Sequence, residues 1–263
     1  MFRVKICGVM TPDDARLVAA AGADAVGLNF VTGSPRCLDP AAAREVATAI
    51  PRGVLRIGVF AGTDPSTARS IAAAVALDAI QFHGHLFHGH LAPPPTGHRN
   101  ACVDPPGVCQ AVAPFRVIRA CRLRVDGPAT AALDEARQWV AAARAEGCGP
   151  AMLLVDAGAP AGAAPGNLGG TGVVVDWERF VAAGDPGLPL ALAGGLTPDN
   201  VAAAIAATGA MAVDTASGVE SGPGRKDPEA VRAFVSRALD AFAARIGGKR
   251  SSGQSPFPFR SDG

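Results

Sequence analysis

Two residues capable of acid–base chemistry end apolar, β-rich runs that lie far apart in the chain. Cys7 ends "FRVKIC" and Asp156 ends "MLLVD". A thiolate can remove a proton from carbon, and a carboxyl group in a partly desolvated site can donate one near neutral pH because burial raises its pKa. Taken alone, a strand-end cysteine can be a buried apolar residue and the aspartate a loop cap, so other residues must support a catalytic interpretation.

Glycine-rich segments in the later part of the chain predict a phosphate site. They read "NLGGTG", "LAGGL" and "TASGVESGPG". Glycine lets backbone N–H groups approach an anion closely, and the last two strand-to-helix loops of an α/β barrel commonly bind phosphate. The residues expected to contact the phosphate are Gly170, Thr171, Gly172, Gly194, Gly195, Ser217 and Gly218.

Side-chain alternation places charged residues beside Cys7. Along the first strand, Lys5 and Cys7 share one face, which leaves Phe2 and the other apolar side chains to face the helices. Asp214 on the last strand is expected to pair with Lys5, because an unpaired buried charge is costly. The Lys5 ammonium would also favour the thiolate of Cys7 and so strengthen it as a base.

Three further polar residues are expected at the same mouth. Arg36, in "GSPRC", has a guanidinium that can bind a planar carboxylate through two hydrogen bonds, although a surface arginine is the commoner interpretation. His83, in "QFHG", should point inward and line the pocket without a direct catalytic role. Arg119, in "FRVIRACRL", is also expected to line the pocket.

The elements that position these residues are eight β-rich runs, nearly all followed by a helical segment. This alternation predicts a parallel sheet, and eight units predict a single (β/α)₈ barrel over residues 1–246. A doubly wound open sheet is disfavoured because no G-x-G-x-x-G follows the first strand. Residues 247–263 are rich in Ser, Gly and Pro and predict a disordered tail.

One unit departs from the pattern. Between His83 and Phe115, three consecutive prolines and Pro105–Pro106 exclude a long helix, so the fourth helix should be short or irregular. The doubled pentapeptide "FHGHLFHGHL" carries four of the five histidines. Spacing by two or three residues does not make ligands converge, so we expect no metal. A metal-binding module or an inactive, degenerate phosphate-binding barrel is the alternative.

Composition limits the partners. The net charge is +1 and the pI about 7.7, without basic blocks, which disfavours nucleic acid. No apolar run reaches the ~18 residues of a membrane span, and no signal-peptide pattern is present. Six cysteines without a C-x-x-C pair indicate free thiols. We expect a cytoplasmic protein, monomeric or homodimeric, that acts on a small molecule.

The ordered motifs resemble phosphoribosylanthranilate isomerase of tryptophan biosynthesis. The matching stretches are "KICG" (5–8), "GAD" and "GLNF" (22–30), "SPR" (34–36), "GVFAG" (58–62), "QFHG" (81–84), "GGTG" and "DW" (169–177), "LAGGL" (192–196), "VDTASGVE" and "GRKD" (213–227). Each is short, but together they run in order to the last helix.

The resemblance implies an Amadori rearrangement of N-(5-phosphoribosyl)anthranilate to 1-(2-carboxyphenylamino)-1-deoxyribulose 5-phosphate without metal or organic cofactor. By the same resemblance, Cys7 is the general base, Asp156 the general acid, and Arg36 the residue that holds the anthranilate carboxylate. The chain departs from the family in the segment after His83 and in Arg119, where lysine is common. The sugar isomerases of histidine biosynthesis use an aspartate where this chain has Cys7, and the indole-forming barrels use carboxylates or lysine.

Overall fold

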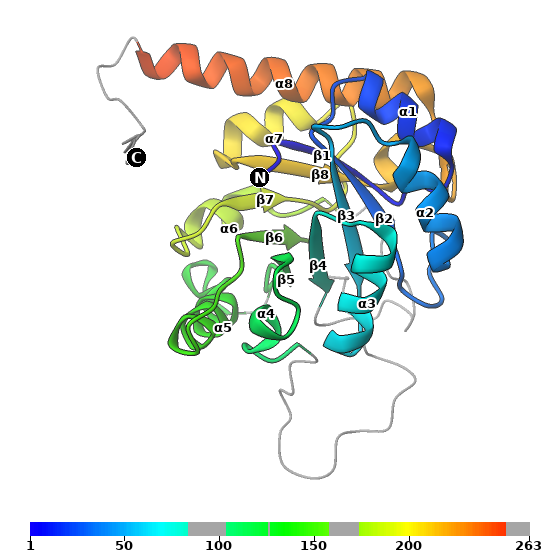
Figure 1. Cartoon of the computed structure of the whole chain (residues 1–263). Coiled ribbons are helices and arrows are strands. Elements are labelled where there is room, and N and C mark those ends of the chain that lie inside the picture. Colours follow the sequence, from blue (N-terminus) through cyan, green and yellow to red (C-terminus); the bar gives the residue numbers. More distant parts are fainter. Residues whose placement is uncertain (84–103, 126, 158–173, 251–263) are drawn as a thin grey trace, which may run out of the picture.

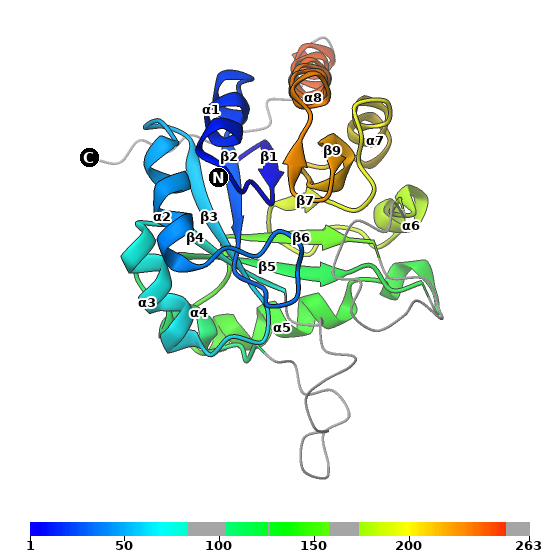
Figure 2. The ribbon, with the colours of Figure 1, turned by 90° about the vertical axis from the view of Figure 1, so that its right-hand side faces the viewer.

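Eight parallel strands close into a barrel, and the helices surround it (Figures 1 and 2). The computed structural model describes residues 1–83, 104–125, 127–157 and 174–250. Each strand pairs with the next in the sequence, and β8 pairs with β1. The strands are β1 (Val4–Cys7), β2 (Ala25–Asn29), β3 (Leu55–Phe60), β4 (Ala79–His83), β5 (Arg116–Arg122), β6 (Met152–Asp156), β7 (Leu190–Leu192) and β8 (Ala212–Thr215). The predicted (β/α)₈ barrel is confirmed.

The helices begin at residues that the sequence marks clearly. Thr11, Asp39 and Asp64 cap α1, α2 and α3, each followed by proline at the first helical position. The side-chain oxygen of the capping residue accepts a hydrogen bond from a free backbone N–H of the first turn. Proline at the first helical position costs no hydrogen bond, because the N–H of that residue would be unpaired in any case. The helices are α1 (Pro12–Ala20), α2 (Pro40–Ala49), α3 (Pro65–Val75), α4 (Val108–Ala111), α5 (Asp134–Ala145), α6 (Trp177–Ala182), α7 (Val201–Thr208) and α8 (Pro228–Arg250).

Two helices test the expected irregularities of the chain. Helix α4 has four residues, which confirms the predicted short fourth helix. Helix α8 runs to Arg250 across α1 and α7 (Figure 1), past the domain boundary predicted after residue 246. The favourable helical composition of the preceding segment carries the helix through Gly247 and Gly248, although glycine is a poor helix former. The rest of the predicted tail, residues 251–263, lies outside the described residues.

The apolar residues form separate layers inside and outside the barrel. One large cluster joins the outward side chains of the strands to the helices, and a smaller one fills the barrel interior with small and medium side chains such as Ala25, Ile57 and Met152. Phe2 belongs to the interior cluster, so the prediction that it faces the helices is wrong. It precedes the first paired residue, Val4, and is therefore not bound by strand alternation.

A small hairpin that the sequence did not predict follows β8. The turn η2 (Ser217–Val219) leads into β9 (Glu220–Gly222), which pairs antiparallel with β10 (Arg225–Lys226) before α8 begins. It returns the chain over the end of the barrel that carries the strand C-termini.

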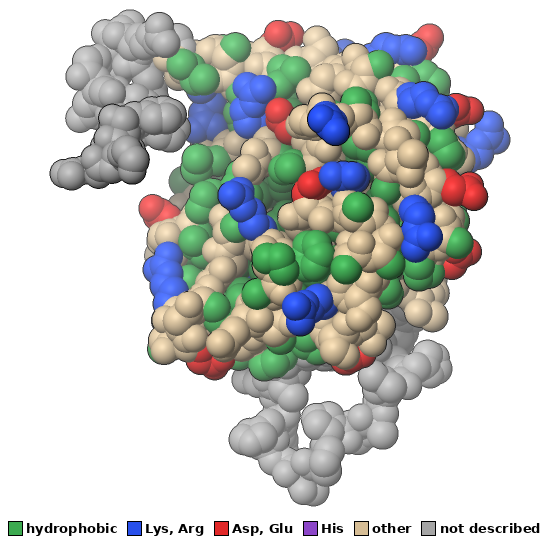
Figure 3. Space-filling model, in the orientation of Figure 1, with side chains coloured by type: hydrophobic (Ala, Val, Ile, Leu, Met, Phe, Trp, Pro, Cys, Tyr) green, Lys and Arg blue, Asp and Glu red, His purple; other side chains and the backbone are tan. Residues whose placement is uncertain are grey.

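The outer surface of the described residues carries mixed charge. On the face in Figure 3, Lys and Arg side chains are scattered among Asp and Glu rather than gathered into one patch. Within the described ranges, no helix is both long enough and apolar enough to span a membrane.

Candidate active site

Cys7 lies at the C-terminal end of β1 with its thiol inside the barrel mouth. It packs against Val31, Val59 and Ala61 and is buried. Gly27 is its neighbour on β2, and a Cβ atom there would lie 2.7 Å from the Cys7 sulfur. A glycine at this position is therefore required for the thiol to occupy its place.

Lys5 and Asp214 form the predicted ion pair inside the barrel. Lys5 Nζ donates to Asp214 Oδ1 over 2.9 Å, and the two residues are aligned neighbours on β1 and β8. Burial raises the pKa of the Cys7 thiol, whereas the ammonium groups of Lys5 and Lys226 oppose this shift only in part. The Lys5 ammonium favours the thiolate of Cys7 as expected, but desolvation outweighs this charge, so the net shift of the Cys7 pKa is upward.

Asp156 ends β6 on the inward face of its strand. Burial raises the pKa of its carboxyl group to about 6, against the opposing hydrogen bond that Ala157 N–H donates to Oδ1 over 2.8 Å. A Cβ atom on Gly194 would lie 2.8 Å from the same Oδ1 atom. The raised pKa expected of this strand-end carboxyl group is confirmed.

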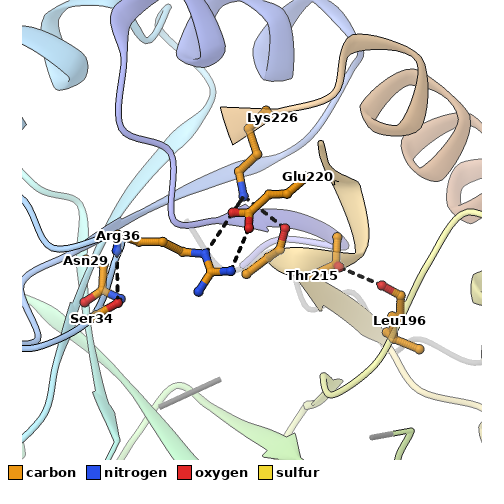
Figure 4. A network of polar contacts seen from close by, with 8 residues as sticks. Asn29, Ser34, Arg36, Leu196, Thr215, Glu220 and Lys226 are labelled. Carbon is orange, nitrogen blue, oxygen red and sulfur yellow. Dashed lines mark hydrogen bonds and ion pairs between the residues drawn. The ribbon is translucent and has the colours of Figure 1, made fainter. Parts of the chain in front are cut away.

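Arg36 is held at the mouth by the loop that follows β2. Asn29 Nδ2 donates to Ser34 Oγ over 3.1 Å, and Ser34 Oγ also accepts from the backbone N–H of Arg36 over 3.2 Å (Figure 4). The side chain crosses Gly8, where a Cβ atom would lie 2.3 Å from Arg36 Cδ. Its guanidinium group meets Glu220 of the hairpin with distances of 2.8 Å from Nε and 2.6 Å from Nη2.

The other two predicted pocket residues differ in their placement. His83 faces inward on β4, and burial, with Lys5, Arg119 and Arg122 nearby, lowers the pKa of its imidazole to about 3, so the ring is neutral. Arg119 points the other way. It pairs with Asp104 over 2.9 Å and lies over the Trp139 ring of α5, 5.2 Å from the ring centre. The prediction that Arg119 lines the pocket is wrong, since it shares the outward face of β5 with Val117.

The loops after β7 and β8 are packed closely against each other. Thr215 Oγ1 donates to Leu196 O over 2.7 Å (Figure 4), and a Cβ atom on Gly218 would lie 1.8 Å from that same carbonyl oxygen. Gly194 and Gly195 both have positive φ, +82° and +63°, which favours glycine. Ser217 starts the turn beside them. The remaining predicted phosphate residues, Gly170, Thr171 and Gly172, lie outside the described residues.

Comparison with known proteins identifies this arrangement. The family model for N-(5'-phosphoribosyl)anthranilate (PRA) isomerase matches residues 4–92 and 122–237. The N-(5'-phosphoribosyl)anthranilate isomerase of Myxococcus xanthus is 43% identical over 90% of this chain and 95% of its own length, and that of Acidithiobacillus ferrooxidans is 38% identical over 90% and 97%. The chain belongs to the PRA isomerase family. It is an enzyme of this class, in tryptophan biosynthesis.

Solved structures agree with this assignment. The PRA isomerase of Thermotoga maritima has a TM-score of 0.70 with 30% identity and covers 91% of this chain and 100% of its own. Another PRA isomerase structure, in complex with reduced 1-(o-carboxyphenylamino)-1-deoxyribulose 5-phosphate, has a TM-score of 0.69 with 29% identity and the same coverage. The family model passes over residues 93–121, which include the proline-rich segment and α4.

Two charged residues at the site of this PRA isomerase were not predicted from its sequence. The side chains of Glu220 and Lys226 are buried at the mouth beside Arg36. Their stretches "VDTASGVE" and "GRKD" are among the family motifs. Charges of opposite sign within a Gly-rich loop were the available signal. Among the described residues no three His, Cys, Asp or Glu side chains cluster as metal ligands, and the histidine repeat beyond His83 lies outside them.

Proposed function

We propose that this PRA isomerase uses Asp156 as the general acid and Cys7 as the general base of the Amadori rearrangement. The observation that carries this proposal is a thiol and a carboxyl group that both face inward at the strand C-termini, on β1 and β6 of the same barrel. The Lys5–Asp214 pair acts electrostatically on both groups, which supports placing them in one site.

The first step needs an acid that still holds its proton near neutral pH. Asp156, with a pKa of about 6, would protonate the furanose ring oxygen of N-(5-phosphoribosyl)anthranilate. The bond from C1 to the ring oxygen then breaks, and the lone pair of the anthranilate nitrogen forms a C1=N bond, which gives the open-chain Schiff base.

The second step needs a base on C2 of the sugar. Cys7 would take the C2 proton as its thiolate, and the electron pair moves to form a C1–C2 double bond and neutralise the nitrogen. The resulting enolamine tautomerises to the 1-amino-2-keto product as C1 gains a proton and the 2-hydroxyl group loses one. In sum, one hydrogen moves from C2 to C1 and one from the 2-hydroxyl group to the former ring oxygen, so the reaction needs no electron acceptor, and no cofactor enters the proposal.

The same site would hold the substrate at both ends. Arg36 would bind the anthranilate carboxylate, and the loops of Gly194–Gly195 and Ser217–Gly218 would bind the phosphate, joined by Gly170, Thr171 and Gly172. The relative bound to the reduced product analogue carries a ligand with both of these groups. Fixing the two ends places the sugar between acid and base.

The test is isomerase turnover in the presence of a chelator, followed by the loss of anthranilate-adduct fluorescence with the next enzyme of the pathway in excess. We expect Cys7→Ser and Asp156→Asn to lose activity by ~100-fold or more while they melt like the parent. Full activity in Cys7→Ala would contradict the mechanism. Light scattering under the same conditions gives the oligomeric state; the Thermotoga maritima relative is described as dimeric.

A further inference from the structure

Arg36 presents only part of its guanidinium group to the barrel mouth. Glu220 occupies one edge through Nε and Nη2, with donor–acceptor distances of 2.8 and 2.6 Å (Figure 4). Nη1 makes no hydrogen bond to any residue that the structure describes. A guanidinium group can offer two parallel N–H donors along each edge, so the edge of Nη1 and Nη2 remains for a second carboxylate.

Lys226 keeps this cluster positive. Its Nζ donates to Glu220 Oε1 over 2.7 Å and to the carbonyl oxygen of Ala216 over 3.0 Å. The side chains of Arg36, Glu220 and Lys226 are 8%, 3% and 0% exposed. An isolated Arg–Glu pair would be neutral, whereas two cations with one anion retain one positive charge in a poorly hydrated place. Such a charge attracts an anion strongly because solvent screens it little.

The position of the cluster agrees with the substrate expected there. The stem of Arg36 crosses Gly8, the residue that follows Cys7, and the charges of Arg36 and Lys226 both interact with the Cys7 thiol. A carboxylate on the free edge of Arg36 would therefore lie next to the proposed base. In the substrate the carboxylate is close to the reacting sugar carbons, because it sits ortho to the nitrogen that C1 carries.

We propose that Glu220 is a positioning residue that holds the guanidinium group of Arg36 so that its Nη1–Nη2 edge receives the anthranilate carboxylate, and that Lys226 supplies the charge that keeps the cluster attractive to it. The inference rests on the proposed role of Arg36. It assigns the hairpin β9–β10 to recognition of the carboxylate, whereas the loop just before the hairpin is proposed to bind the phosphate.

The experiment compares two ligands on the full-length enzyme. One is the reduced product analogue that the related structure binds, and the other is the same compound without its carboxylate. The dissociation constant of the compound without the carboxylate, divided by that of the analogue with it, measures recognition of the carboxylate alone. We expect Glu220→Gln to lower this ratio by about tenfold or more, since the guanidinium loses its orientation.

The matched control is Asp78→Asn. Asp78 holds Arg56 through the same two-bond geometry, with 2.9 Å to Nε and 3.0 Å to Nη2, but it precedes β4 at the opposite end of the barrel. This variant should lose stability and keep the ratio of the parent. A ratio that falls equally in both variants would show a general structural effect and overturn the inference.

Arg36→Met separates the inference from the function on which it rests. If Arg36→Met abolishes discrimination and Glu220→Gln keeps it, the positioning role is wrong and the proposed role of Arg36 stands. If Arg36→Met also keeps it, Arg36 does not bind the carboxylate and both fail. Should Glu220→Gln not fold, Glu220→Gln with Lys226→Met restores the charge of the cluster to +1, and an unchanged ratio in that double variant overturns the inference.

Discussion

In the proposed site the general acid has a lower pKa than the general base, which is the reverse of the order that would keep the acid protonated and the base deprotonated at the same pH. Burial raises the pKa of Asp156 to about 6 and moves the pKa of Cys7 above its ordinary value. The active enzyme needs protonated Asp156 together with Cys7 thiolate. We therefore predict that only a small fraction of the enzyme is correctly protonated at any pH, and that the fraction stays constant across the neutral range.

The order of the two pKa values sets this fraction. The pKa of Asp156 is about 6, and burial holds the pKa of the Cys7 thiol above its ordinary value. Between the two pKa values, a rise in pH forms more Cys7 thiolate and removes the proton from Asp156 to the same extent, so the active fraction is small and constant. Below pH ~6 it falls tenfold per unit, because Asp156 is already protonated and only the thiolate decreases. The pH near 6 at which the rate begins to fall therefore reports the pKa of Asp156.

Two measurements test this prediction. The pH profile of kcat should be flat from about pH 6 up to the raised pKa of Cys7. The thiol itself is followed without substrate by the rate of inactivation with iodoacetamide, which reacts with the thiolate. This rate should rise tenfold per pH unit through the neutral range. Cys7→Ser controls for alkylation of the other cysteines.

An inactivation rate that levels off below pH ~7 would refute the reasoning, because it would show that the charge of Lys5 outweighs burial at Cys7. A kcat that rises or falls tenfold per pH unit between pH ~6.5 and ~8 would also contradict the prediction. It would show that the gain of Cys7 thiolate does not offset the loss of the proton from Asp156.

Three further substitutions have outcomes that the contacts predict. Gly27→Ala should lower kcat by about 10- to 100-fold at similar KM, because its Cβ atom would lie 2.7 Å from the Cys7 sulfur and displace it; steady-state kinetics with unchanged kcat would contradict this. Lys5→Met leaves Asp214 unpaired and should lower the free energy of unfolding by about 3–5 kcal/mol in urea, and a loss below ~1 kcal/mol would mean that the pair contributes little. Asp39→Ala removes the cap of α2 and should cost about 1 kcal/mol with kcat/KM unchanged; a change in kcat/KM would show that α2 affects the site.

Much of this molecule could be predicted without coordinates, because its signals are local or periodic. Prolines and capping residues mark where α1 to α3 begin. Strand alternation alone turned Lys5 and Asp214 inward, and closure of the barrel made them neighbours. The strand-end position of Asp156 was enough to expect a desolvated carboxyl group with a raised pKa.

Other features depended on the packing of segments that are distant in sequence. Alternation places Arg119 on the same face of β5 as Val117, but the folded structure was needed to show that this face points outward. A buried charge in that layer requires partners from other segments, here Asp104 and Trp139. The direction of the Cys7 pKa depended on the balance between burial and the charge of Lys5, and burial is a property of the folded barrel.

The sequence alone determined the barrel, the order of its strands and the polar residues at their ends. Only the tertiary structure decided that Glu220 and Lys226, which follow β8, meet Arg36 from the loop after β2. The physical reason is that a parallel barrel gathers all its strand C-termini at one mouth, while the facing of each side chain there depends on local packing and charge pairing. Gly8 leaves the space that Arg36 occupies, and Gly27 leaves the space that Cys7 occupies.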